Sequence, residues 1–442
     1  MTASALGARN RPDLDGALDQ ARTDYGAKRA KSLEAFEAAT QVMPGGNTRT
    51  VLFHGPFPFR AGRGSEAYLW DVDDNKVLNL LGDFTAGLFG HDNAKIRAAI
   101  TAALDDGLNF GAHNTYEPRF AALICDRFSS IEKVRFTNSG TEANMMAITT
   151  ARAVTGRSKI LVFEGGYHGG VLNFRPGIST SAPFPWVIAP YNDTAAAVAA
   201  IRDNAADLAA VLVEPMLGSG GCVPGTGEFL AALREESERA GSLLILDEVM
   251  TSRLGGHGAQ SLHGIAPDLT TLGKWIGGGM SFGAFGGRGD AMDIYDPRRS
   301  DAVPHAGTFQ NNVLTMAAGI TALGEIYTPE HAVAHDARGE ALRDRLNGIA
   351  DEIGVPVRST GMGSLMNLHP TTRPITDHAG VVGADDRLRE LIFLDLLDAG
   401  YYVARRGFIA LQLPVTDDDL DGFANAYRTV LENRANILQA YG

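Results

Sequence analysis

Short, mainly apolar runs recur along the middle of the chain, and each is followed by a polar or acidic residue. The runs lie at residues 134–136, 160–163, 209–213 and 243–246. Between them, apolar residues recur at helical spacing. Strands that alternate with helices are typical of a mostly parallel, doubly wound sheet. The pattern therefore predicts an α/β fold with a large domain at residues 81–325.

The N-terminal part of the chain, residues 1–80, has a different pattern. Its first dozen residues are polar and are expected to be disordered. Leu33–Val42 has the spacing of one amphipathic helix, and a proline-glycine break follows at residues 43–47. Residues 67–76 alternate around an Asp-Asn turn, which predicts a β-hairpin. We expect this segment to pack against the other end of the chain and to form part of a small domain.

The C-terminal part, residues 326–442, changes composition again and predicts a smaller α+β domain. Its expected elements are helices, one strand and one hairpin. In chain order they lie at 331–353 (helix), 364–369 (strand), 387–399 (helix), 401–406 with 409–413 (hairpin) and the C-terminus (helix). The sequence thus predicts one large domain and one small domain to which both chain ends contribute.

Composition and charge restrict the partners. The chain has 442 residues and a formal net charge of −13, which disfavours nucleic acid and anionic membranes as partners. Cys125 and Cys222 are too few for a disulfide framework and fit a reducing compartment. No apolar run reaches the length that spans a membrane. We expect a cytoplasmic protein that binds small molecules.

Two charged residues are candidates for chemistry. Asp247 follows an apolar run directly, and ligands of open α/β sheets bind outside the carboxyl ends of the strands. Lys274 lies in the glycine-rich, nearly uncharged segment 270–279. A lysine in such a segment either extends to solvent or is kept in a polar pocket for use. Both readings stay open from these residues alone.

The segment Thr137–Glu142 follows a predicted strand and opens a predicted helix. Free backbone N–H groups at a helix N-terminus bind anions, so Ser139, Gly140 and Thr141 are candidates for a phosphate site. The same residues also make an ordinary helix N-cap. The segment by itself therefore does not distinguish a phosphate site from an ordinary N-cap, and other motifs are needed to decide between them.

Taken together, these motifs resemble the class III pyridoxal-phosphate-dependent aminotransferases of fold type I. The resemblance implies pyridoxal 5'-phosphate as cofactor, with Lys274 bonded to it and moving the proton. It also implies that Asp247 faces the ring nitrogen and that Ser139, Gly140 and Thr141 bind the phosphate. The motifs that carry the resemblance are Asn138–Ala143, Asp247–Thr251, Pro267–Lys274 and Gly283–Gly287.

Further roles follow from the same resemblance. Tyr167 would stack on one face of the cofactor ring and Val249 on the other. Glu214, at another strand end, would form a hydrogen bond near the cofactor. Thr308 resembles the residue that reaches the phosphate from a neighbouring subunit, which implies a homodimer with shared active sites. His168 is either a hydrogen-bonding neighbour of the site or merely structural.

The segment 43–58 resembles the β-amino-acid branch of this family, in particular the β-phenylalanine aminotransferases, which lie near the glutamate-1-semialdehyde aminomutases. The segments 247–253 and 403–407 support that branch. The resemblance implies that Arg49 binds the carboxylate of a β-amino acid. Arg406 would then bind the α-carboxylate of 2-oxoglutarate or pyruvate, unless the adjacent arginine does. The aromatic residues that would wall the pocket are Phe53, Phe57 and Phe59, and the alternative arginine is Arg405.

Three competing readings remain. Within the class, the alternative is a glutamate-1-semialdehyde 2,1-aminomutase. Outside it, Ser281 lies in a Gly-x-Ser-x-Gly match at 279–283, but a hydrolase elbow needs a strand before the serine and a helix after it. His331 and His335 lie four residues apart, yet no third metal ligand accompanies them, so we expect solvated histidines and no metal.

Overall fold

The computed structural model describes residues 12–177 and 181–442. Its centre is a seven-stranded sheet with the order β4-β12-β11-β10-β7-β5-β6. Only β12 runs antiparallel to its neighbours, so the predicted mostly parallel sheet is confirmed. The strands are β4 (Lys133–Thr137), β5 (Lys159–Phe163), β6 (Trp186–Ala189), β7 (Leu208–Val213), β10 (Leu243–Asp247), β11 (Leu269–Gly273) and β12 (Gly283–Gly287).

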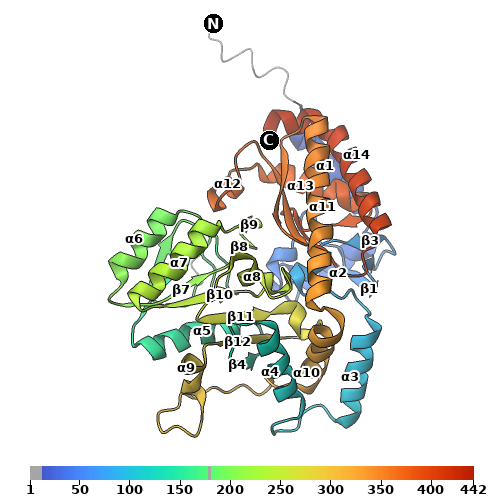
Figure 1. Ribbon diagram of the computed structural model, residues 1–442. Helices are drawn as coiled ribbons and strands as arrows, with labels where there is room; N and C mark the ends of the chain where they lie inside the picture. The colour runs from blue at the N-terminus through green and yellow to red at the C-terminus, as the bar shows by residue number, and fades with distance from the viewer. Residues whose placement is uncertain (1–11, 178–180) are drawn as a thin grey trace.

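Helices cover both faces of this sheet (Figure 1). Alternate residues of a strand point to opposite faces, and β5 uses both. Ile160 and Val162 pack in the apolar cluster that contains α5 (Gly140–Thr155). Leu161 and Phe163 pack in the cluster on the other face, with α6 and α7. The remaining helices of this part of the chain are α6 (Thr194–Asn204), α7 (Gly227–Ala240), α3 (Ala94–Asp106), α4 (Tyr116–Arg127), α8 (Ala259–His263), α9 (Gly289–Met292) and α10 (Val313–Thr321).

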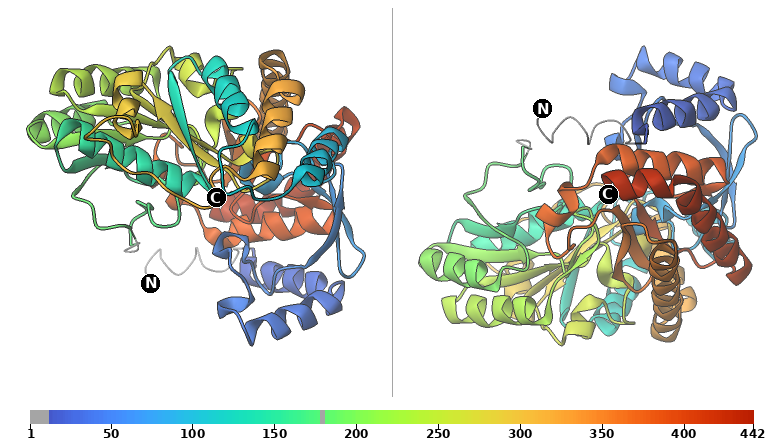
Figure 2. Two further views of the ribbon diagram at one scale, coloured as in Figure 1. Left: turned by 90° about the horizontal axis from the view of Figure 1, so that it is seen from below. Right: turned by 90° about the horizontal axis from the view of Figure 1, so that it is seen from above.

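The two ends of the chain share a second core. Figure 2 shows α1 (Leu14–Ala27) and α2 (Ala30–Thr40) beside the C-terminal helices. Leu18 and Tyr25 of α1 belong to one apolar cluster with Leu391 of α13. Because the two ends share this core, we propose that they form one small domain, with domain boundaries near residues 80 and 325. The C-terminal helices are α11 (Pro329–Ile353), α12 (His378–Val382), α13 (Asp386–Asp398) and α14 (Asp417–Tyr441).

Two small sheets accompany this core, and a two-stranded ribbon lies beside the central sheet. The predicted hairpin at 67–76 is confirmed as the antiparallel pair β2 and β3. The sheets have the orders β1-β2-β3-β15 and β13-β14-β16, and the ribbon is β8-β9. Their bounds are β1 (Ala61–Ser65), β2 (Tyr68–Asp71), β3 (Lys76–Asn79), β15 (Tyr401–Tyr402), β13 (Val357–Met362), β14 (Leu365–Pro370), β16 (Phe408–Ala410), β8 (Met216–Leu217) and β9 (Val223–Pro224).

Two predictions of local structure were wrong. The single helix expected at Leu33–Val42 is preceded by a second helix, α1, which Asp13 caps by accepting a hydrogen bond from the N–H of Gly16. The expected hairpin at residues 401–413 does not form. Its first strand, β15, pairs with β3 and its second, β16, pairs with β14, because a tight turn sends the chain from one sheet to the other. The disorder expected at the N-terminus falls almost entirely on residues 1–11, outside the described part.

Candidate active site

Asp247 ends β10 and is buried at the carboxyl edge of the sheet. Its Oδ2 lies 2.7 Å from Nδ1 of His168 and accepts a hydrogen bond from Nδ2 of Asn144 at 2.8 Å. Its Oδ1 accepts the N–H of Val249 at 3.0 Å. Burial acts to raise the pKa of Asp247, but the hydrogen bond and charge of His168 outweigh it and lower the pKa. The carboxylate is therefore ionised, and His168 is its hydrogen-bonding neighbour.

Asn144 is a site residue that the sequence reading missed. Its Nδ2 also donates to the backbone oxygen of His168 at 3.0 Å, and its Oδ1 accepts from Oγ1 of Thr271 at 2.8 Å. The amide thus joins α5, β10, β11 and the loop after β5. One signal was present, because Asn144 lies next to the apolar stripe of α5, and a buried amide needs partners.

Lys274 follows β11 and begins a short turn, Lys274–Gly277. Its φ of 54° is unusual for a residue other than glycine, and such strain gathers at functional sites. Burial lowers the pKa of its amine to about 8, although the negative charges of Asp247 and Glu214 act to raise it. Among the described residues, none forms a hydrogen bond with this amine. The lysine is therefore a partly buried amine with a large neutral fraction near pH 8.

The N-terminus of α5 forms an anion cradle. Ser139 caps the helix, because its Oγ accepts the N–H of Glu142 at 3.2 Å. The backbone N–H groups of Gly140 and Thr141 precede that bond and have no partner within the helix. A Cβ on Gly140 would lie 2.8 Å from Cγ1 of Val249, and one on Gly273 would lie 3.1 Å from it. The glycines thus leave room for the side chain of Val249 to pack against the start of the helix.

Glu214 fixes the loop that contains Tyr167. Its Oε2 accepts the N–H of Tyr167 and its Oε1 accepts the N–H of Gly218, each at 3.0 Å. Burial raises the pKa of Glu214, and the charge of Asp247 acts in the same direction. The side chain of Tyr167 is itself partly exposed, in the loop that follows β5. Glu214 is therefore a positioning group for this loop.

Arg406 is a partly buried arginine whose guanidinium group has a neutral hydrogen-bond acceptor. Its Nη1 donates to the backbone O of Ser219 at 3.1 Å and to its Oγ at 2.8 Å. Burial and the nearby charge of Arg175 lower the pKa of Arg406 to about 10. Arg175, which the sequence reading missed, donates to the same backbone oxygen at 3.0 Å. In the described part of the chain, neither arginine has a carboxylate within ion-pairing distance.

The neighbouring arginine, Arg405, is paired with two carboxylates of α13. Arg405 donates from Nη2 to Oδ2 of Asp386 at 2.6 Å and to Oε2 of Glu390 at 2.8 Å. These two acids neutralise its charge. Of the two adjacent arginines, Arg406 is therefore the one available to a substrate carboxylate.

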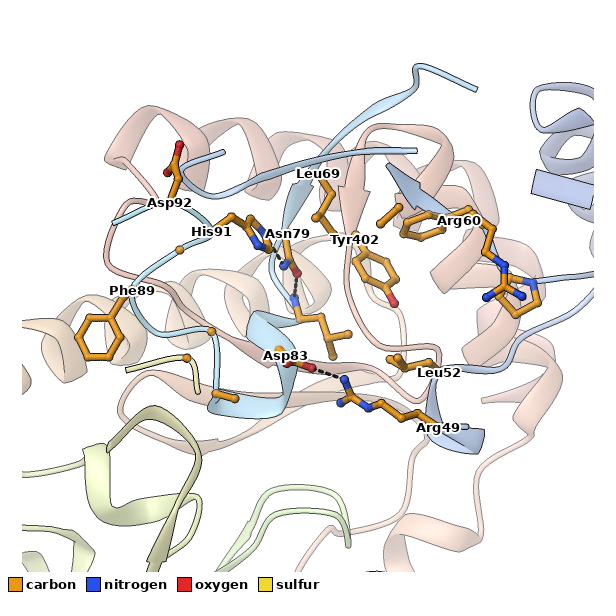
Figure 3. Close-up of a pocket in the computed structure, with 18 of the residues that line it drawn as sticks. Arg49, Leu52, Arg60, Leu69, Asn79, Asp83, Phe89, His91, Asp92 and Tyr402 are labelled. Carbon is orange, nitrogen blue, oxygen red and sulfur yellow. Dashed lines mark hydrogen bonds and ion pairs between the residues drawn. The ribbon is translucent and has the colours of Figure 1, made fainter. Parts of the chain in front are cut away.

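Arg49 lines a cavity of about 840 Å³ between the N-terminal segment and residues 79–100 (Figure 3). Its Nη1 lies 2.7 Å from Oδ1 of Asp83. Phe53 and Phe59 line the same cavity, whereas Phe57 is buried in the core of the chain ends. The lining includes neither Lys274 nor Asp247. The link to the site is Phe84, whose ring centre lies 5.9 Å from the guanidinium carbon of Arg49 and 5.1 Å from that of Arg406.

Four further candidates have other environments. Thr308 is exposed in the segment between α9 and α10. Ser281 directly precedes a strand and follows a turn, so no nucleophile elbow exists and the hydrolase reading is wrong. His331 is exposed, but His335 is buried with Nε2 3.1 Å from the backbone O of Leu411, which corrects the expectation that both are solvated. Within the described residues, no group of three or more His, Cys, Asp or Glu is placed to hold a metal.

Residues 53–426 match the family model described as aminotransferase class-III. The chain therefore belongs to the class III aminotransferases and is a pyridoxal-phosphate-dependent aminotransferase of fold type I. It is 48% identical to the β-phenylalanine transaminase of Variovorax paradoxus over 96% of this chain and 98% of that one. The crystal structure of a β-phenylalanine aminotransferase from that organism superposes with a TM-score of 0.94 over the same shares.

Two other relatives are more distant. The crystal structure of an omega-transaminase from Sphaerobacter thermophilus is 35% identical, with a TM-score of 0.86 over 93% of this chain and 98% of that chain. A glutamate-1-semialdehyde 2,1-aminomutase of Heliobacterium modesticaldum is 36% identical over 92% of this chain and 98% of that protein. Both the transaminases and the aminomutases are thus close enough to share the family.

The residues present fit pyridoxal phosphate. The amine of Lys274 has no hydrogen-bond partner among the described residues, as a lysine that bonds an aldehyde requires. The N-terminus of α5 offers free N–H groups to a phosphate. Asp247 is held ionised, which suits a protonated ring nitrogen. In the part of the chain that the structure describes, no helix combines the length and apolar character needed to cross a bilayer.

Proposed function

We propose that this enzyme transfers the amino group of a β-amino acid with an aromatic side chain, such as β-phenylalanine, to 2-oxoglutarate or pyruvate. One observation supports it most directly. The guanidinium carbons of Arg49 and Arg406 lie 5.9 Å and 5.1 Å from the ring centre of Phe84, and each guanidinium group suits a carboxylate. The identity of 48% to a β-phenylalanine transaminase supports the same substrate class.

The proposal assigns a role to each part of the site. Lys274 bonds the cofactor and moves the proton at the substrate carbon, and Asp247 faces the ring nitrogen. Bound pyridoxal phosphate supplies the electron sink for the negative charge left by that proton. Tyr167 and Val249 flank the ring, and Glu214 positions the loop of Tyr167. The phosphate is received by Ser139, Gly140 and Thr141.

The carboxylate assignments follow the environment of each arginine. Arg406 receives the α-carboxylate of the keto acid, because its buried Nε lacks a partner and its acceptor is neutral. Arg49 receives the carboxylate of the β-amino acid, which lies one carbon further from the amine. Phe53 and Phe59 provide the apolar wall for an aromatic group.

We also propose a homodimer in which Thr308 of one subunit reaches the phosphate bound by the other. The exposure of Thr308 in a single chain supports this, because a partner could then cover it. Two free cysteines support a reducing compartment, the cytoplasm. Light scattering of the purified enzyme measures the subunit number, and Thr308→Val would weaken phosphate binding if the assignment is right.

A screen of the amino-donor half-reaction tests the substrate class. The purified enzyme is mixed with α- or β-amino acids, and conversion of the bound cofactor to its pyridoxamine form is followed by absorbance. β-Phenylalanine is expected to react fastest. Glutamate-1-semialdehyde is included, because the alternative function is that of an aminomutase. If no β-amino acid reacts and the semialdehyde is isomerised, the aminomutase function replaces our proposal.

A further inference from the structure

The turn Gly82–Thr85 has an unusual backbone. Its four residues have φ values of 54°, 45°, 51° and 84°, and three of them are not glycine. Residues with side chains rarely adopt this left-handed region, and runs of them persist only where the surroundings impose them. Here Oδ1 of Asn79 accepts the N–H groups of Leu81 at 3.1 Å and Gly82 at 3.2 Å. The turn is thus held in a strained form beside the cavity.

This strained turn presents two side chains to the substrate arginines. Asp83 points to Arg49, as the dashed line in Figure 3 shows, with 2.7 Å between Oδ1 and Nη1. Phe84, the next residue, places its ring centre 5.9 Å from the guanidinium carbon of Arg49 and 5.1 Å from that of Arg406. Consecutive residues of an extended strand would point to opposite faces. The left-handed turn therefore brings both a carboxylate and a ring to Arg49.

The two arginines differ in their partners. Arg406 is partly buried, with a buried Nε, and its hydrogen-bond acceptor is the neutral Ser219. Arg49 already has a carboxylate partner, and the side chains of the pair are 49% and 50% exposed. Ion pairs this exposed contribute little net free energy, so a second carboxylate can replace the first.

We propose that Asp83 is a specificity-determining residue that pairs with Arg49 in the substrate-free enzyme and is exchanged for the carboxylate of the amino donor. The inference rests on the proposed function, in which Arg49 binds that carboxylate. Asp83 weakens donor binding because the donor must displace it. It leaves the keto acid unaffected, because that carboxylate binds Arg406. Between turnovers Asp83 keeps the charge of Arg49 neutralised.

Substitutions at Asp83 test this in the holoenzyme. Asp83→Asn removes the charge and tolerates the left-handed conformation, and Asp83→Gly removes the side chain without backbone strain. Asp92→Asn is the matched control, because Asp92 lines the same cavity but accepts hydrogen bonds from Ser65 and the N–H of Glu66. Half-saturation is measured for β-phenylalanine and for pyruvate in the separate half-reactions. Calorimetry with 3-phenylpropanoate, an unreactive carboxylate, gives a readout that is independent of turnover.

Both Asp83 variants are expected to lower the half-saturating concentration of β-phenylalanine, and the Kd of 3-phenylpropanoate, about two- to fivefold. The value for pyruvate and all values for Asp92→Asn stay unchanged. In an Arg49→Ala background, Asp83→Asn is expected to have no effect. The inference is overturned if Asp83→Asn tightens binding equally in the Arg49→Ala background. It is also overturned if neither Asp83 variant tightens donor binding in the otherwise unaltered enzyme.

The Arg49→Ala variant alone separates this inference from the proposed function. If it binds β-phenylalanine as well as the unaltered enzyme does, Arg49 is not the carboxylate ligand, and both proposals fail. If it binds more weakly while the Asp83 variants bind normally, only the role of Asp83 is rejected.

Discussion

Nδ1 of His168 lies 2.7 Å from Oδ2 of Asp247, and both side chains are buried at the carboxyl edge of the central sheet. The contact lowers the pKa of Asp247 against the effect of burial. His168 therefore helps to keep Asp247 ionised, and the proposed chemistry requires this carboxylate in its ionised form.

Asp247→Asn is expected to lower kcat by orders of magnitude while changing KM little. A unit charge pair at about 4 Å and an effective dielectric near 20 contributes about 4 kcal/mol. The amide would leave the ring nitrogen largely unprotonated, so stabilisation is lost in the transition state rather than in binding. Steady-state kinetics with both substrates measures the loss. Near-normal turnover would show that Asp247 does not face the ring.

His168→Phe is expected to raise the pKa of Asp247, because the hydrogen bond and charge of His168 no longer oppose the effect of burial. Activity is therefore lost on the acid side at a higher pH than in the unaltered enzyme. At alkaline pH, where Asp247 is ionised in both proteins, the difference in kcat shrinks. The pH profile of kcat measures this shift. A loss that is uniform across pH would indicate a merely structural role for the histidine.

Lys274 gives a pH prediction for the cofactor-free enzyme. The neutral amine is the nucleophile, and its pKa is lowered to about 8. The rate of recombination with pyridoxal phosphate should therefore rise with pH and level off above about 8, not near 10, where an exposed lysine titrates. Lys274→Ala should fold and bind the cofactor, yet retain none of it after borohydride treatment and denaturation. Covalent labelling at a different lysine contradicts the assignment.

The sequence predicted the sheet and its charged edge because both depend on local patterns. Apolar runs mark β7 and β10, and the residues directly after them are the acids of the site. The sequence did not predict the roles of Asn144, Arg175 and Asp83, because each role depends on a contact with a residue far along the chain. Arg175 forms a hydrogen bond with Ser219, 44 residues further along the chain, and Arg49 forms one with Asp83, 34 residues further along. The false hairpin at residues 401–413 has the same cause, since alternation predicts strands but not their partners.

Arg49→Ala and Arg406→Ala are expected to affect different substrates. The first should raise KM for the β-amino acid, and the second KM for the keto acid. A charge-assisted bidentate pair contributes about 1.5–3 kcal/mol, so each increase should be about ten- to a hundredfold. Arg405→Ala is the matched control, because its partners are Asp386 and Glu390 and only stability should fall. Equal losses for both substrates in both variants would reject a two-sided pocket.

Arg175 gives the last prediction. Arg175 and Arg406 both donate to Ser219, and each has a buried Nε that lacks a hydrogen-bond partner. Two neighbouring, partly buried cations repel each other, and an incoming carboxylate relieves that repulsion. Arg175→Leu is therefore expected to raise KM for the keto acid about tenfold and leave KM for the β-amino acid unchanged.

Ser219→Ala is the companion variant, because it removes the neutral side-chain acceptor and leaves both arginines in place. Its KM for the keto acid should stay the same or fall, since the carboxylate no longer competes with the hydroxyl. Both variants are measured with pyruvate and with 2-oxoglutarate. An effect of Arg175→Leu confined to 2-oxoglutarate would place the second carboxylate of that acceptor at Arg175, whereas equal effects would place the shared α-carboxylate there. An unchanged KM for both keto acids would leave Arg175 a structural partner of Ser219 alone.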